Sequence, residues 1–480
     1  MDKAMVDMRW RVAALIAGVF WLIGLTVVPA WAGSPIVYVP SPNGTDDTTN
    51  IQSALDMCVQ QHPKGCTVQL GAGTYLTRAL VAYNFHGTFK GRSTSATIIE
   101  AIYPLLVTVP DFYYGVCKPN TTSCIWPSLI MFVDGDIHIS DLSIHIVAPP
   151  GSATTGWYAQ GTKLTDLIDA IRVMGQYPTN ATVDRIDVEA RPDNSPTSFG
   201  FNLINGVCFP GELPRSPSPY DYYRLSGSFV VRNSSFRSMN DGVAWGNVTA
   251  SHFSVGGSPS TGNSFDNLNV GVDMESAEQS QIEVSFNQST GIYYSAWVVP
   301  WISSVFIPSA PSRYSIHDND FRTTGAYATG ILVYNEPGHP WINAAIWNNS
   351  VQLQGTLSDG IDAVNTQLTT IVNNKISGTG YDGIGLWSST WSTAIGNNLK
   401  GFGPDATVGL AQIYLDSYTS ENLVMCSNPS DTVLNQGLNN ATIGCHQIGS
   451  TPQAETARAA PEPSVPDRGV FRKRPSGFWP

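Results

Sequence analysis

Charged residues are scarce in this chain of 480 residues, where Asp, Glu, Lys and Arg together make up only 13%. An ordinary soluble domain carries about 25%, and solvent-exposed helices need charged side chains on their outer faces. The sequence contains neither Cys-x-x-Cys nor His-Glu-x-x-His, so it lacks the common zinc-ligand spacings and predicts no metal site of that kind. Glycine is abundant instead, with 44 residues, alongside many Asn, Ser and Thr, a composition typical of turn-rich β structure.

Positive charge is also scarce, with 25 Lys and Arg against 37 Asp and Glu and a net charge of −12. Residues 1–32 carry three basic and two acidic side chains, and residues 451–480 carry five and three, so the body between them has a net charge of −15. Nucleic-acid binding depends on clustered Lys and Arg. We therefore predict no nucleic-acid partner, and the acidic body disfavours a polyanionic substrate.

Long apolar runs are missing after the first one, which extends from Val12 to Val28. That run follows three basic residues and precedes Ala30-Trp31-Ala32, a pattern typical of a signal peptide. We expect residues 1–32 to be cleaved off, leaving no membrane segment in a protein that is secreted, periplasmic or held at the cell surface; the alternative is an uncleaved anchor. Residues 451–480 hold six prolines and little apolar periodicity, which predicts a disordered tail.

Seven cysteines follow the predicted cleavage site, and an exported protein can form disulfides. Three pairs are close in sequence and can bond locally, although the spacing does not fix the connectivity: Cys58 with Cys66, Cys117 with Cys124, and Cys426 with Cys445. Cys208 is then left over, and we expect it to be a buried thiol.

Two marks recur along the body, an Asn near a turn and, about ten residues later, a Gly followed by an aliphatic residue. The Asn marks are Asn233, Asn263, Asn287, Asn319, Asn348, Asn373 and Asn397. The Gly marks are Gly242, Gly271, Gly291, Gly330, Gly360, Gly383 and Gly409. Successive Gly marks are 20 to 39 residues apart, a period that indicates stacked repeats, each burying its apolar face against its neighbours.

The segments between these marks are short, alternating and rich in β-branched residues, as in 228–231, 281–284 and 370–372, so the repeat unit is built from strands. About three short strands in each repeat predict an all-β fold, a single-stranded right-handed parallel β-helix over residues 33–450. Asn tolerates the left-handed conformation of a tight turn, and its amide can bond the equivalent Asn one coil away.

Residues 41–76 precede most of the repeats and contain Asp46-Asp47-Thr48-Thr49-Asn50-Ile51-Gln52-Ser53-Ala54, followed by Gly71-Ala72-Gly73-Thr74-Tyr75. This pair of motifs resembles the N-terminal cap of the pectate-lyase superfamily of β-helix proteins, which includes polygalacturonase-like hydrolases and phage tailspikes. The resemblance implies a pectin-lyase-like fold and a polysaccharide partner. On the residues themselves, Asp47 or Thr48 can cap a helix whose apolar stripe, Ile51 to Cys58, covers the first coil.

Equivalent positions of successive coils form rows, because parallel strands lie about 4.8 Å apart. The residue after each Gly mark points inward, so the second and fourth residues point outward. The second-position row is Ala244, Asp273, Tyr293, Leu332, Asp362 and Gly385. The fourth-position row is Gly246, Glu275, Ser295, Tyr334, Val364 and Trp387. One outward face therefore combines carboxylates with aromatic rings, as a sugar groove requires.

Glycoside hydrolysis uses two carboxylates on either side of the scissile bond. We expect Asp362 to act with Asp382 or Asp359, each of which lies directly before a Gly mark. The predicted substrate-binding residues are Asp273, Glu275, Tyr293, Tyr334 and Trp387. Asp-Gly is also a favoured turn dipeptide, so a purely structural role for Asp359 and Asp382 stays open.

Two other functions stay open beside hydrolysis of a polysaccharide. A polysaccharide lyase would add calcium, held by carboxylates, and a basic residue as the proton acceptor, for which Arg313 and Arg322 are the nearest candidates; a hydrolase needs no cofactor. A noncatalytic glycan-binding or surface-structural β-helix is the third function. Asn240-Asp241-Gly242 resembles part of the polygalacturonase signature, but its Asp-Asp, Gly-His-Gly and Arg-x-Lys elements do not follow. The sequence does not predict the oligomeric state.

Overall fold

The computed structural model describes residues 34–448 apart from internal gaps, so the predicted signal peptide and tail lie outside the described residues. The gaps are 103–104, 111–122, 148–156, 160–161, 165–167, 176, 192–203, 211–224, 293–295, 303–309, 326–327, 336–341, 356–357 and 403–410. Among the described residues, no helix is long and apolar enough to cross a membrane.

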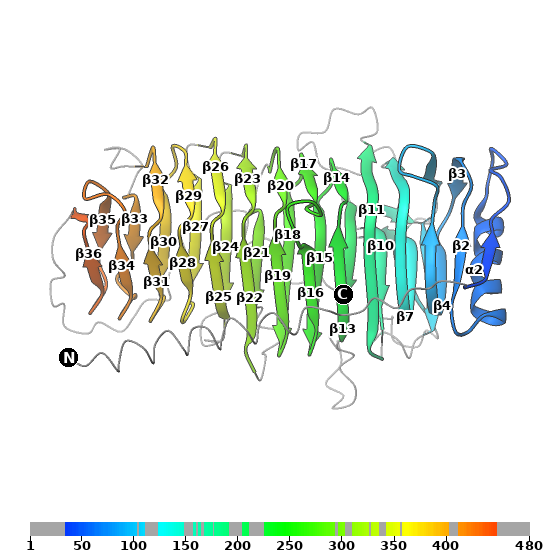
Figure 1. Cartoon of the computed structure of the whole chain (residues 1–480), viewed down its shortest axis with the longest axis horizontal. Coiled ribbons are helices and arrows are strands. Elements are labelled where there is room, and N and C mark those ends of the chain that lie inside the picture. Colours follow the sequence, from blue (N-terminus) through cyan, green and yellow to red (C-terminus); the bar gives the residue numbers. More distant parts are fainter. Residues whose placement is uncertain are drawn as a thin grey trace, which may run out of the picture. The chain divides into compact units, whose positions relative to one another are not determined.

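The chain winds through three parallel sheets, and each strand pairs with the equivalent strand of the next coil (Figure 1). The first sheet contains β10 (Ile168–Met174), β12 (Ile204–Pro210), β15 (Asp241–Thr249), β18 (Val270–Glu278), β21 (Val298–Ile302), β24 (Thr329–Asn335), β27 (Asp359–Val364), β30 (Asp382–Trp387), β33 (Ile413–Leu415), β35 (Thr432–Asn435) and β37 (His446–Gln447). Three strands in most coils give the predicted parallel β-helix.

The other two sheets are built in the same way. The second contains β1 (Ile36–Tyr38), β2 (Cys66–Gln69), β13 (Gly227–Arg232), β16 (His252–Gly256), β19 (Gln281–Ser285), β22 (Ser312–His317), β25 (Ile342–Trp347), β28 (Thr370–Val372), β31 (Thr393–Ile395), β34 (Leu423–Met425) and β36 (Ala441–Ile443). The third contains β3 (Gly73–Thr77), β5 (Thr97–Ala101), β14 (Ser235–Arg237), β17 (Ser264–Asp266), β20 (Gln288–Ser289), β23 (Asp320–Thr323), β26 (Ser350–Leu353), β29 (Lys375–Ser377) and β32 (Asn398–Lys400).

A few strands depart from this pattern near the N-terminal coils. The long strands β4 (Leu80–Lys90), β7 (Ser123–Val147) and β11 (Thr179–Arg191) continue from one sheet into the next. Strand β6 (Leu106–Pro110) pairs antiparallel with the start of β7, and β8 (Trp157–Ala159) pairs antiparallel with β9 (Thr162–Leu164).

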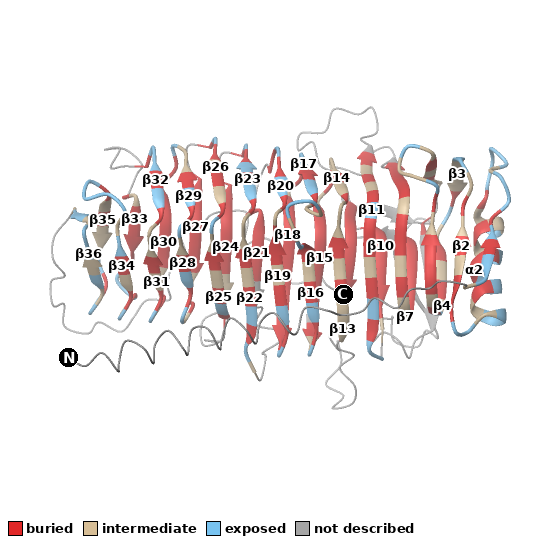
Figure 2. Cartoon of the chain, viewed as in Figure 1, coloured by how far each residue is buried: buried red, intermediate tan, exposed pale blue. Residues whose placement is uncertain are grey.

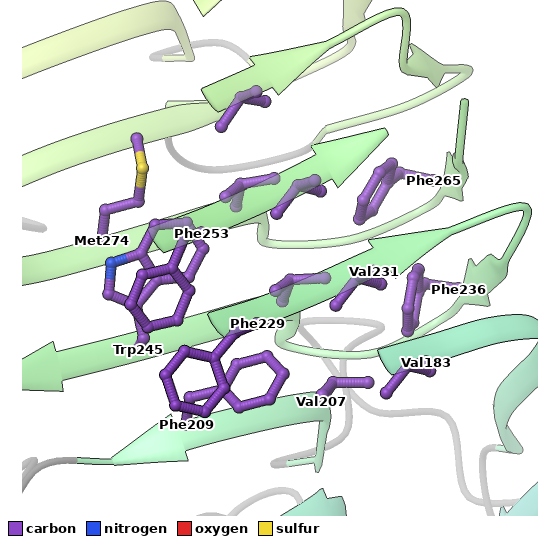
Figure 3. Close-up of a cluster of buried hydrophobic side chains, with 14 of the residues drawn as sticks. Val183, Val207, Phe209, Phe229, Val231, Phe236, Trp245, Phe253, Phe265 and Met274 are labelled. Carbon is purple, nitrogen blue, oxygen red and sulfur yellow. The ribbon is translucent and has the colours of Figure 1, made fainter. Parts of the chain in front are cut away.

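The core runs along the inside of the coils, where inward side chains of all three sheets are buried (Figure 2). Like residues lie on like: Phe229 pairs in register with Phe253, and their rings stack at 4.7 Å. Phe253 also stacks on Trp245 at 4.4 Å (Figure 3). Aromatic pairs of this kind add about 0.5–1.5 kcal/mol to the burial of their surface.

Helix α2 (Thr48–Gln61) covers the N-terminal coil, as the resemblance implied. It buries the predicted stripe of Ile51, Ala54, Leu55 and Cys58, and Cys58 is bonded to Cys66 of β2. Asp47 occupies the predicted N-cap position, but its side chain makes no helix-capping bond. Its carboxylate instead accepts the backbone N–H groups of Asn43 and Leu76, which fastens the helix to the preceding turn and to β3.

Two of the three predicted disulfides form, Cys58 to Cys66 and Cys426 to Cys445, and Cys208 is a free buried thiol as expected. Cys117 lies outside the described residues. The second bond joins the turn after β34 to the segment between β36 and β37, in the last two coils.

A ladder of buried asparagines marks the turn between the second and third sheets. Its members are Asn263, Asn287, Asn319, Asn349, Asn374 and Asn397, all less than 5% exposed. Each Nδ2 donates to the Oδ1 of the next member, with distances of 2.9–3.0 Å. Three predicted marks, Asn233, Asn348 and Asn373, were placed one residue too early. These residues hold the left-handed turn position, with φ of 51°, 56° and 55°. Asn349 and Asn374 are the ladder residues that follow two of them, and Ser234 follows Asn233 and bonds Asn263.

We expect Asn319→Ala to lower the free energy of unfolding by about 3 kcal/mol, measured by urea titration. The Asn319 side chain accepts two hydrogen bonds from Asn287 and donates to Val284 and Asn349. The substitution leaves buried donors and acceptors without a hydrogen-bond partner, which costs about 1–3 kcal/mol for each group. Asn348→Gly is the matched control, because Asn348 is exposed at a positive φ that glycine adopts freely; an equal loss in both variants would contradict the role of the ladder.

His317 predicts a pH dependence of stability. Its ring stacks on Trp347 at 4.2 Å and lies edge-on to Phe286. Burial alone would lower the pKa of His317, but Glu283 and Asp318, at 3.5 and 2.8 Å, outweigh it and raise the pKa. The folded pKa therefore exceeds the unfolded value, so the stabilisation is complete at acidic pH and is lost as pH rises through the folded pKa.

The measurement compares melting temperatures at pH 5.5 and pH 8.5. We expect wild type to lose about 1–3 °C more over this interval than His317→Gln. His252→Gln, at an exposed position of the same sheet, should behave as wild type. Equal pH dependence in wild type and His317→Gln would refute the contribution of His317.

Candidate functional site

The outward positions of the first sheet form the predicted rows, with one correction. The second-position row is Ala244, Asp273, Val299, Leu332, Asp362, Gly385 and Tyr414. The fourth-position row is Gly246, Glu275, Trp301, Tyr334, Val364 and Trp387. Val299 and Trp301 thus take the places assigned to Tyr293 and Ser295, and both of those residues lie outside the described part of the chain.

The correction has a local cause. Ile292, which follows the Gly291 mark, bridges to Leu268 and Thr323 at a corner instead of entering the first sheet. The strand of that coil is β21, where Val298 pairs with Val272 on one side and Ile331 on the other. Trp297 therefore precedes the inward residue in the place that glycine holds in the neighbouring coils.

Three carboxylates gather on β27 and β30. Asp359 pairs in register with Asp382, one coil away, and Asp362 lies on the same strand as Asp359. One oxygen atom of each lies within 4.8 Å of the other two, and the three side chains are 0%, 3% and 0% exposed. The structure thus brings together all three residues that the sequence predicted as catalytic. Asp359 and Asp382 are the first residues of their strands, so neither sits inside a turn.

Glycine fixes the strand start beside each of these aspartates. A Cβ atom on Gly360 would overlap the carbonyl oxygen of Gly383 and the side chain of Ile376. Close approach of neighbouring residues therefore requires glycine at positions 242, 271, 330 and 360, whereas a Cβ atom on Gly383 would meet its nearest atoms at 3.1 Å. The φ angles of these glycines are ordinary. This packing holds Asp359 and Asp382 at the same height on adjacent coils.

Asp362 is held by Trp387, whose indole N–H donates to its carboxylate at 3.2 Å. Gly385 makes this contact possible, because a Cβ atom there would overlap both the Asp362 carboxylate and the Trp387 indole nitrogen. The Trp387 ring also packs on Tyr414 of β33, with ring centroids 4.6 Å apart. A polar contact and an aromatic pair thus border the acid group on its C-terminal side.

Tyr414 and Asp416 are functional candidates that sequence reasoning missed. The Tyr414 hydroxyl donates to Gln436 at 3.1 Å, and burial together with Asp416 and Asp382 raises its pKa to about 12. Burial also raises the pKa of Asp416, against backbone N–H bonds that lower it. Their coil carries Gln412 where Gly383 stands in the preceding one. The mark predicted for this coil, Gly409, comes three residues earlier in the sequence and lies outside the described residues, so the predicted rows did not reach Tyr414.

The predicted substrate-binding residues divide into two groups. Trp387 lies beside the acid group, and half-buried Tyr334 lies one coil before it. Asp273 and Glu275 are on β18, three coils before Asp362, or roughly 14 Å at the usual strand spacing. A small apolar cluster of Val270, Ala296, Val299 and Leu332 fills the coils between them. The outward face therefore has two groups of acidic residues, one on β18 and one on β27 and β30, and the apolar cluster separates them.

No family model matches the chain, and no curated protein matches it in sequence. Solved structures do match. The A-module of a mannuronan C-5 epimerase from Azotobacter vinelandii matches at 13% identity, over 85% of this chain and 96% of that chain, with a TM-score of 0.52. The Dettilon tailspike protein matches at 14% identity, over 85% and 68%, with a TM-score of 0.49. A polygalacturonase from Erwinia carotovora matches at 13% identity, over 88% and 96%, with a TM-score of 0.38.

The three-sheet parallel winding and the match to the epimerase module decide the fold. The chain has the pectin-lyase-like right-handed parallel β-helix fold. At 13% identity this likeness establishes the fold alone, because one fold carries many activities. What this pectin-lyase-like chain does must therefore be argued from its own residues, beginning with the acid group of Asp359, Asp362 and Asp382.

We expect Gly385→Ala to lower the free energy of unfolding by about 1–3 kcal/mol, the usual cost of overpacking. The added methyl group must displace Asp362 or Trp387. Gly246→Ala is the matched control on the same outward face, since its nearest atom, Cβ of Glu275, lies 3.5 Å away. Urea unfolding of both variants checks this. Equal stability of the two variants would show that the acid group tolerates a shift of Asp362.

Proposed function

We propose that this protein is an exported glycoside hydrolase that acts on a polysaccharide through Asp359, Asp362 and Asp382. The observation that carries the proposal is the approach of the three carboxylates to within 4.8 Å on adjacent coils. Paired carboxylates about 5–5.5 Å apart serve retaining hydrolysis, whereas inversion requires about 6.5–9.5 Å to admit a water molecule. The limit of 4.8 Å joins single oxygen atoms, one from each carboxyl group, and is compatible with a catalytic pair on adjacent coils.

The surroundings of each carboxylate suggest its role. The Trp387 N–H bond stabilises the ionised form of Asp362, which suits a nucleophile. Asp382 pairs with Asp359 in register and also faces Tyr414, near Asp416. Neighbouring negative charge favours the protonated form of a carboxyl group, so we assign Asp382 as the general acid. Asp359 then lies beside both residues, and its negative charge favours the protonated form of Asp382.

The substrate class follows from charge and from the rings that border the acid group. Among the described residues, no Lys or Arg occurs in β24, β27, β30 or β33, so nothing there would neutralise a polyanion. The half-buried rings of Tyr334 and Trp387 offer aromatic surface for sugar rings. A neutral polysaccharide fits this face best. The matched epimerase is, by its name, an enzyme of mannuronan, which supports a polysaccharide as the substrate class.

Export is supported by the two disulfides, which persist in oxidising compartments. They fit a protein that is secreted, periplasmic or held at the cell surface, as does the predicted signal peptide.

A calcium-dependent lyase is the second candidate, because three carboxylate oxygens within 4.8 Å also suit a cation. They supply fewer than the roughly six to eight oxygen ligands that calcium takes. The basic residues considered from the sequence lie elsewhere, since Arg313 is on β22 of the second sheet and Arg322 on β23 of the third. A lyase here would lack its base among the described residues, so hydrolysis ranks first.

We expect Asp382→Asn to reduce kcat at least about a thousandfold, measured as release of reducing ends from neutral and uronic polysaccharides. The same substitution should leave the melting temperature unchanged or raise it, because it replaces a buried carboxyl group, crowded by two others, with an amide of the same shape that cannot ionise. Activity of the wild type should be insensitive to EDTA, and products should carry no unsaturated uronate. Calcium-dependent formation of unsaturated products would select the lyase instead.

Asp241→Asn is the matched control, since Asp241 is also buried directly before a Gly mark, at the start of β15. It should retain wild-type activity. If both substitutions abolished activity equally, the aspartates before glycine would be structural. Glycan binding by wild type with no product from any polysaccharide would leave only the noncatalytic function.

A further inference from the structure

The corner between the first and second sheets contains a column of residues in the left-handed conformation. Leu368, Trp391, Glu421 and Asn439 follow one another coil by coil, with φ of 59°, 51°, 58° and 55°. Backbone bonds fix their equivalence: the N–H of Leu368 donates to Thr390, that of Trp391 to Ser420, and that of Glu421 to Leu438. Asn suits this conformation, whereas bulky side chains are rarely found in it.

Two members of the column are apolar, strained and open to solvent at the same time. Leu368 is 57% exposed and Trp391 is 54% exposed. The left-handed conformation is unfavourable for both side chains, and it buries neither of them. Strain and exposed apolar surface at one place indicate a binding surface, because packing of the chain explains neither.

A carboxylate holds the exposed indole. The Nε1–H of Trp391 donates to the Glu421 carboxylate, which fixes one edge of the ring. Tyr418, 46% exposed, lies in the turn that also contains Ser420 and Glu421. Exposed aromatic rings, one of them bonded to a carboxylate, are a combination that binds sugars, which present an apolar face and a rim of hydroxyl groups.

The corner surface, defined as Leu368, Trp391, Tyr418 and Glu421, is attached to the acid group. Trp391 follows Trp387 by four residues in the same coil. One oxygen of Asp416 accepts the N–H of Ser388 at 2.9 Å and the N–H of Tyr418 at 3.1 Å. The turn after β30 and the turn after β33 are therefore held by a single carboxylate, which lies between Tyr414 and the corner surface.

We propose that the corner surface is an accessory binding site for a polysaccharide chain, with Trp391 as the stacking residue. This inference rests on the proposed function for its substrate class, and binding alone can test it. The corner residues follow the coil spacing of about 4.8 Å, comparable to the length of one sugar unit, so a chain lying along the column meets a new side chain at each unit. Its effect is to hold a long chain near the acid group.

The test uses affinity electrophoresis of the full chain, in native gels containing xylan, galactomannan, hydroxyethyl cellulose, polygalacturonate or alginate. We expect retardation by at least one neutral polymer. Trp391→Asn should weaken it about tenfold, the loss of one stacking contact. Because Asn439 already occupies the equivalent position at φ 55°, Asn at 391 should keep or raise the melting temperature. An unfolded variant is therefore not expected.

The matched control is Gln279→Asn, an exposed residue at φ 50° whose neighbour Ser280 continues the same corner in an earlier coil. It should bind as wild type. Retardation of Trp391→Asn equal to wild type, or no retardation of wild type in any of the gels, overturns the inference. A wild-type dimer that Trp391→Asn converts to a monomer in light scattering also overturns it, since the surface would then bind a second copy.

All binding measurements are repeated in the Asp382→Asn background, which separates the two proposals. If Trp391→Asn weakens binding there while wild type releases no product, the corner site stands and hydrolysis fails. If wild type hydrolyses a polymer but Trp391→Asn changes neither its binding nor its KM, hydrolysis stands and the corner site fails.

Discussion

The asparagine ladder at the turn between the second and third sheets sets the geometry on which the outward face depends. Each inner ladder side chain receives two hydrogen bonds from the coil before it and gives one to the coil after it, as Asn319 does with Asn287 and Asn349. A one-residue slip would break these bonds in a buried place, at a cost that surface hydrogen bonds do not carry. The turn therefore fixes register, and register places Asp359 opposite Asp382.

Close packing at the glycine marks adds to the alignment that the asparagine ladder provides. The ladder aligns coils at one turn, and the glycines before the inward aliphatic residues let the first sheet approach the third closely enough to close the coil, as the contact between Gly360 and Ile376 shows. Where Trp297 replaces glycine, the neighbouring aromatic residues Phe265 and Phe321 pack against it instead. The coil still closes, but its strand no longer follows the Gly-aliphatic mark.

Much of the fold and the acid group could be predicted, because they depend on short-range patterns that repeat. The parallel winding and the gathering of Asp359, Asp362 and Asp382 follow from period and alternation. The two disulfides follow from cysteines close in sequence, and the cap stripe from the resemblance of its motifs. The failures come from single coils that break the pattern. Nothing local distinguishes Asn348 from Asn349, or shows that Gly291 leaves the sheet. Tyr414 was missed because the mark assigned to its coil was Gly409, whereas Gln412 takes the glycine place there.

Two energetically unfavourable features lie in the same few coils of the C-terminal half of the β-helix. Three carboxylates crowd together between β27 and β30, and the next turn holds a tryptophan in a conformation suited to asparagine. A structural repeat would place Thr or Asn at such positions, as Thr329 in β24 and Asn439 in the last coils show. Both departures lie within one coil of each other and are linked through Asp416. Unfavourable choices that cluster in space, in a fold otherwise made of mutually supporting repeats, are the physical signature of a site kept for binding and chemistry.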